Sequence, residues 1–394
     1  MGDFMRYYKI ICVVCCFIGF MLFGSFGEAL GVIEMQSAAK TDLQLQKINL
    51  VWQPTFEKEN NVAEIPKIDG VNVVSPCWFA IDTVQGHINS SVANREYVRK
   101  AHEKGYKVWA LITNSFDDEM TSDLFKNKAV QRHIIQQMEL LAYSYNLDGF
   151  NLDFENIKDE DKDCLTSFVQ DIAVAMKNKN KSISIDVTVP GKVSNWSACY
   201  DRKALGKIVD YVILMAYDEN SRLSKRSGSV ASLPWVERGL VTTLKDVPAE
   251  KVILGVPLYM RRWEEIHGTV LARTLTMKEA EKIIADKKLQ PVWLEKEKQY
   301  YFEYGEKEKK YRVWQENAKS LKYKSALVGK YKLAGIASWR KGFEQPDVWP
   351  VLKESIVPLG QFSKISIEKA KVEKKSFLLR KKNDKTESLI DRNI

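Results

Sequence analysis

The chain has 394 residues, of which 45% are hydrophobic and 28% are charged. This composition is typical of a globular protein and excludes a wholly disordered chain or one built mainly of membrane-spanning helices. The length allows two ordinary domains or one large α/β barrel. The formal net charge of +9 favours anionic partners such as acidic cell-wall polymers, lipid headgroups or nucleic acid.

The first 30 residues predict export. Arg6 and Lys9 precede an apolar run over residues 10–26, which is the pattern of a secretory signal peptide. The run is also long enough for a membrane anchor, so residues 1–30 are interpreted as a signal peptide or an N-terminal membrane anchor. We therefore expect an extracellular or cell-envelope protein, for which nucleic acid is the poorest of the anionic partners.

Eight short runs rich in β-branched residues alternate with segments of helical period. The predicted strands are 48–52, 71–76, 106–113, 147–155, 182–189, 209–217, 251–257 and 333–339, and two clear amphipathic helices are 129–143 and 163–177. This alternation predicts an α/β fold, a (β/α)8 TIM barrel over residues 45–355. An interval of about residues 262–313 breaks the rhythm, which predicts a small α+β insertion between strands 7 and 8. Residues 360–394 are predicted to be a solvated basic tail.

Three cysteines follow the N-terminal segment, namely Cys77, Cys164 and Cys199. Their odd number and irregular spacing predict neither a disulfide framework nor a metal site, and one bridge is left open.

The fourth predicted strand carries the residues best suited to chemistry. Side chains alternate along a strand, so Asn151, Asp153 and Glu155 share the face that points into the barrel. Glu155 ends the strand, at the C-terminal mouth where barrel enzymes hold their active sites. Two inward carboxylates about 6.5–7 Å apart at Cα resist joint ionisation, which makes one of them a usable general acid. The alternative is a polar layer neutralised by Lys or Arg from neighbouring strands.

The ends of the other strands are rich in residue types that bind sugars. Aromatic rings stack on pyranose rings, and polar side chains hold hydroxyl groups. A single tryptophan at such a place also fits a core position. The residues of these types at the strand ends are Trp78, Trp109, Asn114, Tyr217, Asp218, Tyr259, Arg262 and Trp339.

The octapeptide Asp148-Gly149-Phe150-Asn151-Leu152-Asp153-Phe154-Glu155 resembles the signature of the family 18 glycoside hydrolases, Asp-Gly-x-Asp-x-Asp-x-Glu. Further segments are similar to strands 6, 7 and 8 of that family: Met215-Ala216-Tyr217-Asp218, Gly255-Val256-Pro257-Leu258-Tyr259 and Gly335-Ile336-Ala337-Ser338-Trp339. The resemblance covers all eight strands and implies the same barrel.

The resemblance implies substrate-assisted catalysis, in which no protein side chain is the nucleophile. It implies no metal and no organic cofactor. Glu155 would protonate the glycosidic oxygen, and Asp153 would orient the substrate's 2-acetamido group. The signature and its companion motifs place Tyr217, Asn151 and Asp148 with the catalytic residues. They place Trp339, Asp218 and Met215 with the residues that bind the sugar in the −1 subsite.

One position departs from the family pattern, because Asn151 stands where the signature has its middle acid. An amide cannot share a proton with Asp153, so the relay of charge is shortened. The same asparagine resembles the bacterial cell-wall and spore-cortex branch of the family, as do Ser75-Pro76-Cys77-Trp78-Phe79 and the run 337–344.

The expected function is therefore hydrolysis of β-1,4 bonds next to N-acetylglucosamine, with peptidoglycan favoured over chitin. Anionic envelope polymers are possible additional partners. The alternative function is a non-catalytic, lectin-like carbohydrate-binding protein on the same barrel. A third reading, a structural or partner-binding protein of the envelope, would use the basic tail and the insertion.

Overall fold

The computed structural model describes residues 47–191 and 193–356. The predicted signal peptide or anchor of residues 1–30 and the basic tail of residues 360–394 lie outside the described residues. Within the described ranges, no helix is both long and apolar enough to cross a membrane.

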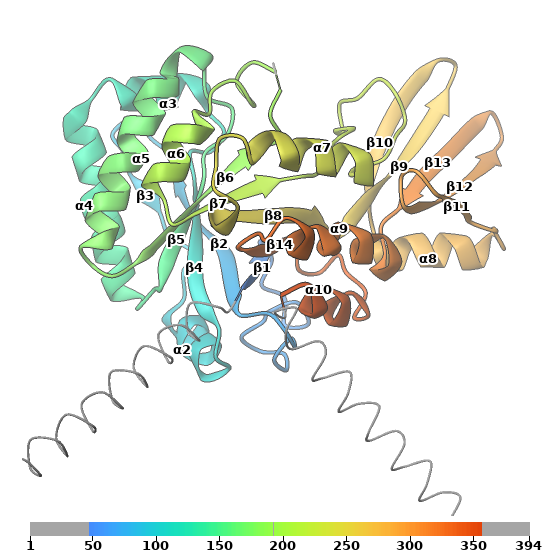
Figure 1. Cartoon of the computed structure of the whole chain (residues 1–394), viewed down its shortest axis with the longest axis horizontal. Helices are drawn as coiled ribbons and strands as arrows, with labels where there is room; N and C mark the ends of the chain where they lie inside the picture. Colours follow the sequence, from blue (N-terminus) through green and yellow to red (C-terminus); the bar gives the residue numbers. More distant parts are fainter. Residues whose placement is uncertain (1–46, 192, 357–394) are drawn as a thin grey trace, which may run out of the picture. The chain divides into compact units, whose positions relative to one another are not determined.

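Eight parallel strands form a closed barrel (Figure 1). Strand β1 pairs with β14 on one side and with β2 on the other, which closes the sheet and confirms the predicted TIM barrel. The strands are β1 (Ile48–Gln53), β2 (Val73–Ile81), β4 (Lys107–Thr113), β5 (Gly149–Asp153), β6 (Ser182–Thr188), β7 (Tyr211–Met215), β8 (Val252–Pro257) and β14 (Gly335–Trp339). The short β3 (Ile88–Asn89) adds an antiparallel hairpin partner to β2.

Helices follow the barrel strands and cover the outer face of the sheet (Figure 1). They are α2 (Arg95–Glu103), α3 (Asp118–Phe125), α4 (Lys128–Ser144), α5 (Lys162–Lys177), α6 (Arg202–Ile208), α7 (Leu233–Thr243), α9 (Ala318–Lys330) and α10 (Val348–Ile356). Two 3-10 turns, Asp159–Asp161 and Ala249–Lys251, precede α5 and β8. The apolar stripe predicted for α5 is buried in full: Leu165, Phe168, Val169, Ile172 and Met176.

The alternation along β5 separates two environments. Phe150, Leu152 and Phe154 pack outward, in the hydrophobic layer between the sheet and the helices. A second apolar cluster lies inside the barrel and includes Trp52 and Trp109. The inner face of β5 is polar instead, so that Asn151 and Asp153 lie above this inner apolar layer.

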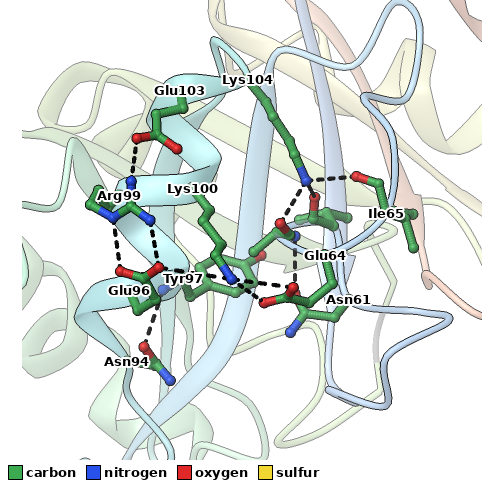
Figure 2. Close-up of polar contacts among 12 residues, drawn as sticks. Asn61, Glu64, Ile65, Asn94, Glu96, Tyr97, Arg99, Lys100, Glu103 and Lys104 are labelled. Atoms are coloured by element: carbon green, nitrogen blue, oxygen red, sulfur yellow. Dashed lines mark hydrogen bonds and ion pairs between the residues drawn. The ribbon is translucent and has the colours of Figure 1, made fainter.

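Helix α2 is fastened to the segment that follows β1, as Figure 2 shows. Asn94 caps the helix by accepting a hydrogen bond from the Tyr97 backbone N–H. Lys100 pairs with Glu64 at 2.9 Å, and Lys104 donates to backbone carbonyls of residues 62, 63 and 65. These contacts fix the loop that leaves β1 at the C-terminal end of the barrel.

The insertion between β8 and β14 is a five-stranded antiparallel sheet with one helix. Its elements are β9 (Tyr259–Ile266), β10 (Thr269–Thr276), α8 (Met277–Asp286), β11 (Val292–Leu294), β12 (Gln299–Glu306) and β13 (Lys309–Gln315). The strand order is β10-β9-β13-β12-β11. The insertion expected at residues 262–313 is thus confirmed, with boundaries a few residues wider on each side.

A fully buried ion pair joins the insertion to α9. Lys324 donates to both carboxylate oxygens of Glu316, at 2.9 and 3.0 Å, and neither side chain is exposed. Ser320 and Gln299 donate to the same carboxylate. Because each charge and polar atom of this group has a partner, the connection is specific as well as buried.

Candidate active site

Glu155 lies two residues after the end of β5, and hydrogen bonds hold the backbone there from two sides. The Asn114 amide accepts from the Glu155 N–H at 3.0 Å and donates to the Glu155 carbonyl at 2.8 Å. The Tyr200 hydroxyl donates to the carbonyl of the preceding Phe154 at 2.7 Å. These contacts fix the point at which the chain leaves the strand, and so the direction of the Glu155 side chain.

Asp153 is buried, and Glu155 beside it is half-buried. Burial raises the pKa of Asp153 to about 7. Burial, the charge of Asp153 and a hydrogen bond with its carboxyl group raise the pKa of Glu155 well above its ordinary value. The pair therefore holds a proton on Glu155 near neutral pH, as a general acid requires. The Oδ1 atom of Asp153 is buried and has no hydrogen-bond partner among the described residues.

Asn151 occupies the centre of a polar network below the two acids. Its Oδ1 accepts from Trp52 Nε1 at 2.7 Å, and its Nδ2 donates to Ser184 Oγ at 3.1 Å and to Asp186 Oδ1 at 2.7 Å. The indole is a donor only, which fixes the orientation of the amide. Asp186 is 1% exposed, and burial followed by the charge of Asp153 raises its pKa well above the ordinary value.

A second cluster lies at the ends of β7 and β8. Asp218 has a left-handed backbone (φ 61°), and its Oδ1 accepts from the Tyr259 hydroxyl and from Arg261 Nη2, both at 2.6 Å. The ring of Tyr217 meets that of Tyr259 edge to face, at 6.3 Å between centroids. Burial raises the pKa of Tyr217 well above its ordinary value, and the nearby charges of Asp186, Asp153 and Glu155 raise it further, so Tyr217 lies near the acid pair.

Trp339 ends β14 and Met215 ends β7, the two strands that flank β8. Trp339, half-buried at the end of β14, contacts Trp52 edge to face at 5.8 Å. Met215 ends β7 and is 8% exposed. Together with the acid pair and the Asp218 cluster, these residues line one end of the barrel, where all of them follow or finish a parallel strand.

Three expectations about site residues are corrected. Asp148 precedes β5 at the opposite end of the strand, roughly 23 Å from Glu155 at 3.3 Å per residue, and it accepts from His102 and the Val108 N–H. It ties strands and helix together at the base of the barrel. Trp78 is 3% exposed and packs on the outer side against Phe56, Phe79, Tyr97 and Tyr145.

Arg262 is the third correction, because it lies on the other face of β9 from Arg261 and stacks on the ring of Tyr311. Its neighbour Arg261 makes the contact with Asp218 instead. Asn114 is near the site as predicted, but it is 2% exposed and both of its amide atoms are engaged. Asn114 therefore positions the backbone of Glu155.

Asp186, Arg261 and Tyr200 belong to the site but were not predicted from the sequence. Asp186 carried a readable signal, since Ser184 and Asp186 alternate with Ile183, Ile185 and Val187 along β6 just as the acids do on β5. Cys77, Cys164 and Cys199 are free thiols. Burial raises the pKa of Cys77, and the nearby charges of Asp153 and Asp186 raise it further. Within the described ranges no cluster of metal-ligating side chains occurs.

Comparison with known proteins identifies the family. The sequence model of glycosyl hydrolases family 18 matches residues 55–343. The chain is 32% identical over 296 residues to the uncharacterized glycosylase YvbX of Bacillus subtilis, covering 72% of this chain and 84% of YvbX. It is 26% identical over 255 residues to a cortical fragment-lytic enzyme of B. subtilis, covering 62% of this chain and 59% of that enzyme.

Solved structures share the fold. The spore cortex-lytic enzyme SleL of Bacillus megaterium superposes with a TM-score of 0.70 and 22% identity, over 79% of this chain and 74% of SleL. A chitinase of Chromobacterium violaceum superposes with a TM-score of 0.71 and 22% identity, over 79% of this chain and 99% of the chitinase. On the family match and the YvbX similarity, the chain belongs to family 18 of the glycosyl hydrolases and is a glycosidase.

Proposed function

We propose that this glycosidase cleaves β-1,4 bonds next to N-acetylglucosamine by substrate-assisted, retaining catalysis. The observation that carries the proposal is the acid pair, in which Glu155 holds a proton and the buried Oδ1 of Asp153 has no hydrogen-bond partner among the described residues. A buried carboxylate oxygen without a donor is costly unless a ligand supplies one. The N–H of a 2-acetamido group is such a donor.

In the first step, the Glu155 carboxyl group donates its proton to the glycosidic oxygen as the bond from that oxygen to the anomeric carbon breaks. The acetamido carbonyl oxygen of the same sugar bonds to the anomeric carbon, which gives a cyclic oxazolinium ion. Asp153 holds the acetamido N–H and balances the positive charge. In the second step, a water oxygen bonds to the anomeric carbon while the Glu155 carboxylate takes a proton from that water. The bond from the acetamido oxygen to the anomeric carbon breaks, which leaves N-acetylglucosamine with retained configuration.

The surrounding residues support binding of that sugar. The Tyr217 hydroxyl faces the acid pair and could donate to the acetamido oxygen, which would fix it for attack. Tyr259 and Arg261 both donate to Oδ1 of Asp218, and its other carboxylate oxygen has no partner among the described residues, so it is open to a sugar hydroxyl. Trp339 provides an aromatic surface beneath the ring of the −1 sugar.

Peptidoglycan is proposed as the substrate ahead of chitin. Both polymers present the required acetamido group, so the mechanism does not separate them. Two observations favour the wall: the similarity to a cortical fragment-lytic enzyme, and the net charge of +9, which aids approach to an anionic polymer but not to neutral chitin. The proposed location is the outside of the cell or the envelope, as the pattern of residues 1–30 predicts, with anionic envelope polymers as additional contacts.

The test is incubation of the purified chain with peptidoglycan and with chitin oligosaccharides, followed by mass analysis of the products. We expect wall fragments with N-acetylglucosamine at the new reducing end. We also expect added salt to slow attack on the charged wall more than on a small neutral oligosaccharide. Efficient cleavage of chitin oligosaccharides with no product from peptidoglycan would reverse the ranking. Binding of both glycans without products from either would favour the lectin-like alternative.

A further inference from the structure

The loop between β7 and α7 presents three cations at the mouth of the barrel. Arg222, Lys225 and Arg226 are exposed, and within the described ranges no carboxylate pairs with any of them. Some other cations that follow barrel strands have a carboxylate partner at 2.6–2.7 Å, as Lys158, Arg261 and Lys341 do. The three loop cations have none among the described residues, so their charge is free for a ligand.

The base of this loop is closed by hydrogen bonds across it. The Glu219 N–H donates to the Val230 carbonyl at 2.8 Å, and Asn220 Nδ2 donates to the Ser229 carbonyl at 2.8 Å. Gly228 permits this closure, because a Cβ atom there would lie 2.3 Å from Asn220 Nδ2. A side chain at position 228 would thus displace the Asn220 amide from the Ser229 carbonyl.

The same loop is fixed to the insertion. Ser227 Oγ donates to Glu265 at 2.5 Å, and Trp263 Nε1 donates to the Gly228 carbonyl at 2.8 Å, so the loop contacts β9 at two points. Its tip is a tight turn in which Ser224 Oγ donates to the Arg226 carbonyl at 2.8 Å. The three cations are therefore carried by a braced loop, which loses little freedom when a ligand binds.

The loop is within reach of a group attached to the sugar chain. Arg222 follows Asp218 by four residues, so the two lie at most about 14 Å apart. A stem peptide of four residues spans a similar distance, up to about 14 Å when extended. Such a peptide, attached through the lactyl group of muramic acid, carries at least its terminal carboxylate into the surroundings of the cleft.

We propose that Arg222, Lys225 and Arg226 form a binding site for the carboxylates of the peptidoglycan stem peptide, and so select peptide-bearing glycan. The inference rests on the proposed function, because it concerns the substrate of the same cleft. Chitin has no acidic arm and gains nothing from this loop. Exposed ion pairs of this kind affect binding rather than the chemical step.

The test compares one triple variant with a matched control. Arg222→Gln, Lys225→Gln and Arg226→Gln together remove the loop charges. The control triple, Lys177→Gln, Lys179→Gln and Lys181→Gln, removes three charges near the opposite end of β6. Each protein is assayed on soluble glycan strands with stem peptides, on the same strands stripped by an amidase, and on chitin oligosaccharides. The measured quantity is kcat/KM on peptide-bearing strands divided by kcat/KM on stripped strands.

We expect this ratio to fall about three- to tenfold in the loop variant through KM, as befits a few exposed ion pairs, and to stay constant in the control. A ratio that does not change in the loop variant overturns the inference, as does an equal fall in the control. Wild-type protein that cleaves only peptide-free glycan or chitin also overturns it, while leaving glycoside hydrolysis intact. Loss of cleavage on all three substrates in the wild type would instead contradict the proposed function.

Discussion

Replacing Asp153 with asparagine should stabilise the protein at neutral pH and not in acid. In the folded chain the pKa of Asp153 rises from its ordinary 3.8 to about 7 because the group is buried. Below pH 4 the carboxyl group is neutral in both the folded and the unfolded chain, and its burial has no ionic cost. Between pH 4 and pH 7 the unfolded chain releases this proton while the folded chain retains it. Folding therefore loses stability as pH rises through this window.

The size of the effect follows from the same values. The span from 3.8 to about 7, at 1.36 kcal/mol for each pH unit, corresponds to roughly 4 kcal/mol above pH 7. Asparagine has nearly the same shape and carries no charge, so the variant avoids this cost. Its gain in the free energy of unfolding should grow from near zero at pH 4 to a few kcal/mol at pH 8, while glycan hydrolysis is lost.

Urea unfolding of both proteins at pH 4, 6 and 8 measures the gain. Asp82→Asn is the matched control, because Asp82 is a surface aspartate whose pKa is lowered by a hydrogen bond with His87. Its replacement should have the opposite sign, a small loss of stability that is present above the ordinary pKa and absent in stronger acid. A gain in the Asp153 variant that is equal at pH 4 and pH 8 would refute the argument from buried charge.

Three further substitutions test the site. Glu155→Gln removes the transferable proton and should lower kcat by about 10²–10⁴-fold with glycan binding retained; unchanged turnover would contradict its role. Asn151→Asp adds a carboxylate 2.7 Å from Asp186, so the basic limb of the pH–rate profile should move to higher pH. A basic limb that stays in place or moves to lower pH would show that residue 151 has no electrostatic contact with Glu155. Asn114→Ala leaves two backbone groups of Glu155 without partners, so it should lower the free energy of unfolding in urea by about 2–4 kcal/mol and also lower kcat. Wild-type values of both quantities would contradict the role of Asn114 in holding the Glu155 backbone.

The barrel and the acid pair could be predicted because both depend on local patterns. Eight strand-like runs separated by helical periods leave few other folds, and the alternation along β5 fixes which side chains point inward. Two residues that belong to the same sequence motif need not lie close together in the fold. Asp148 belongs to the same octapeptide as Glu155, but the length of the strand puts it at the other end of the barrel.

The remaining errors come from register. The pairing of β2 with β4 shifts between Cys77 and Phe79, and Cys77 rather than Trp78 lies near the acids. The choice between Arg261 and Arg262 depends on the parity of β9, which is set by its pairing with β10 and β13. No local pattern reveals where such a shift falls, since it depends on partners distant in the sequence.

The most direct test of the account concerns the substrate's own acetamido group. Aryl glycosides of N-acetylglucosamine oligosaccharides with zero, one, two or three fluorines on the acetamido methyl group would be hydrolysed by the wild-type chain. Fluorine withdraws electrons from the carbonyl oxygen, which weakens it as a nucleophile but leaves the leaving group and Glu155 unchanged. If that oxygen attacks the anomeric carbon, kcat/KM should fall at every step of the series. A rate that does not depend on fluorination would contradict substrate assistance and would require a nucleophile from the protein or from water.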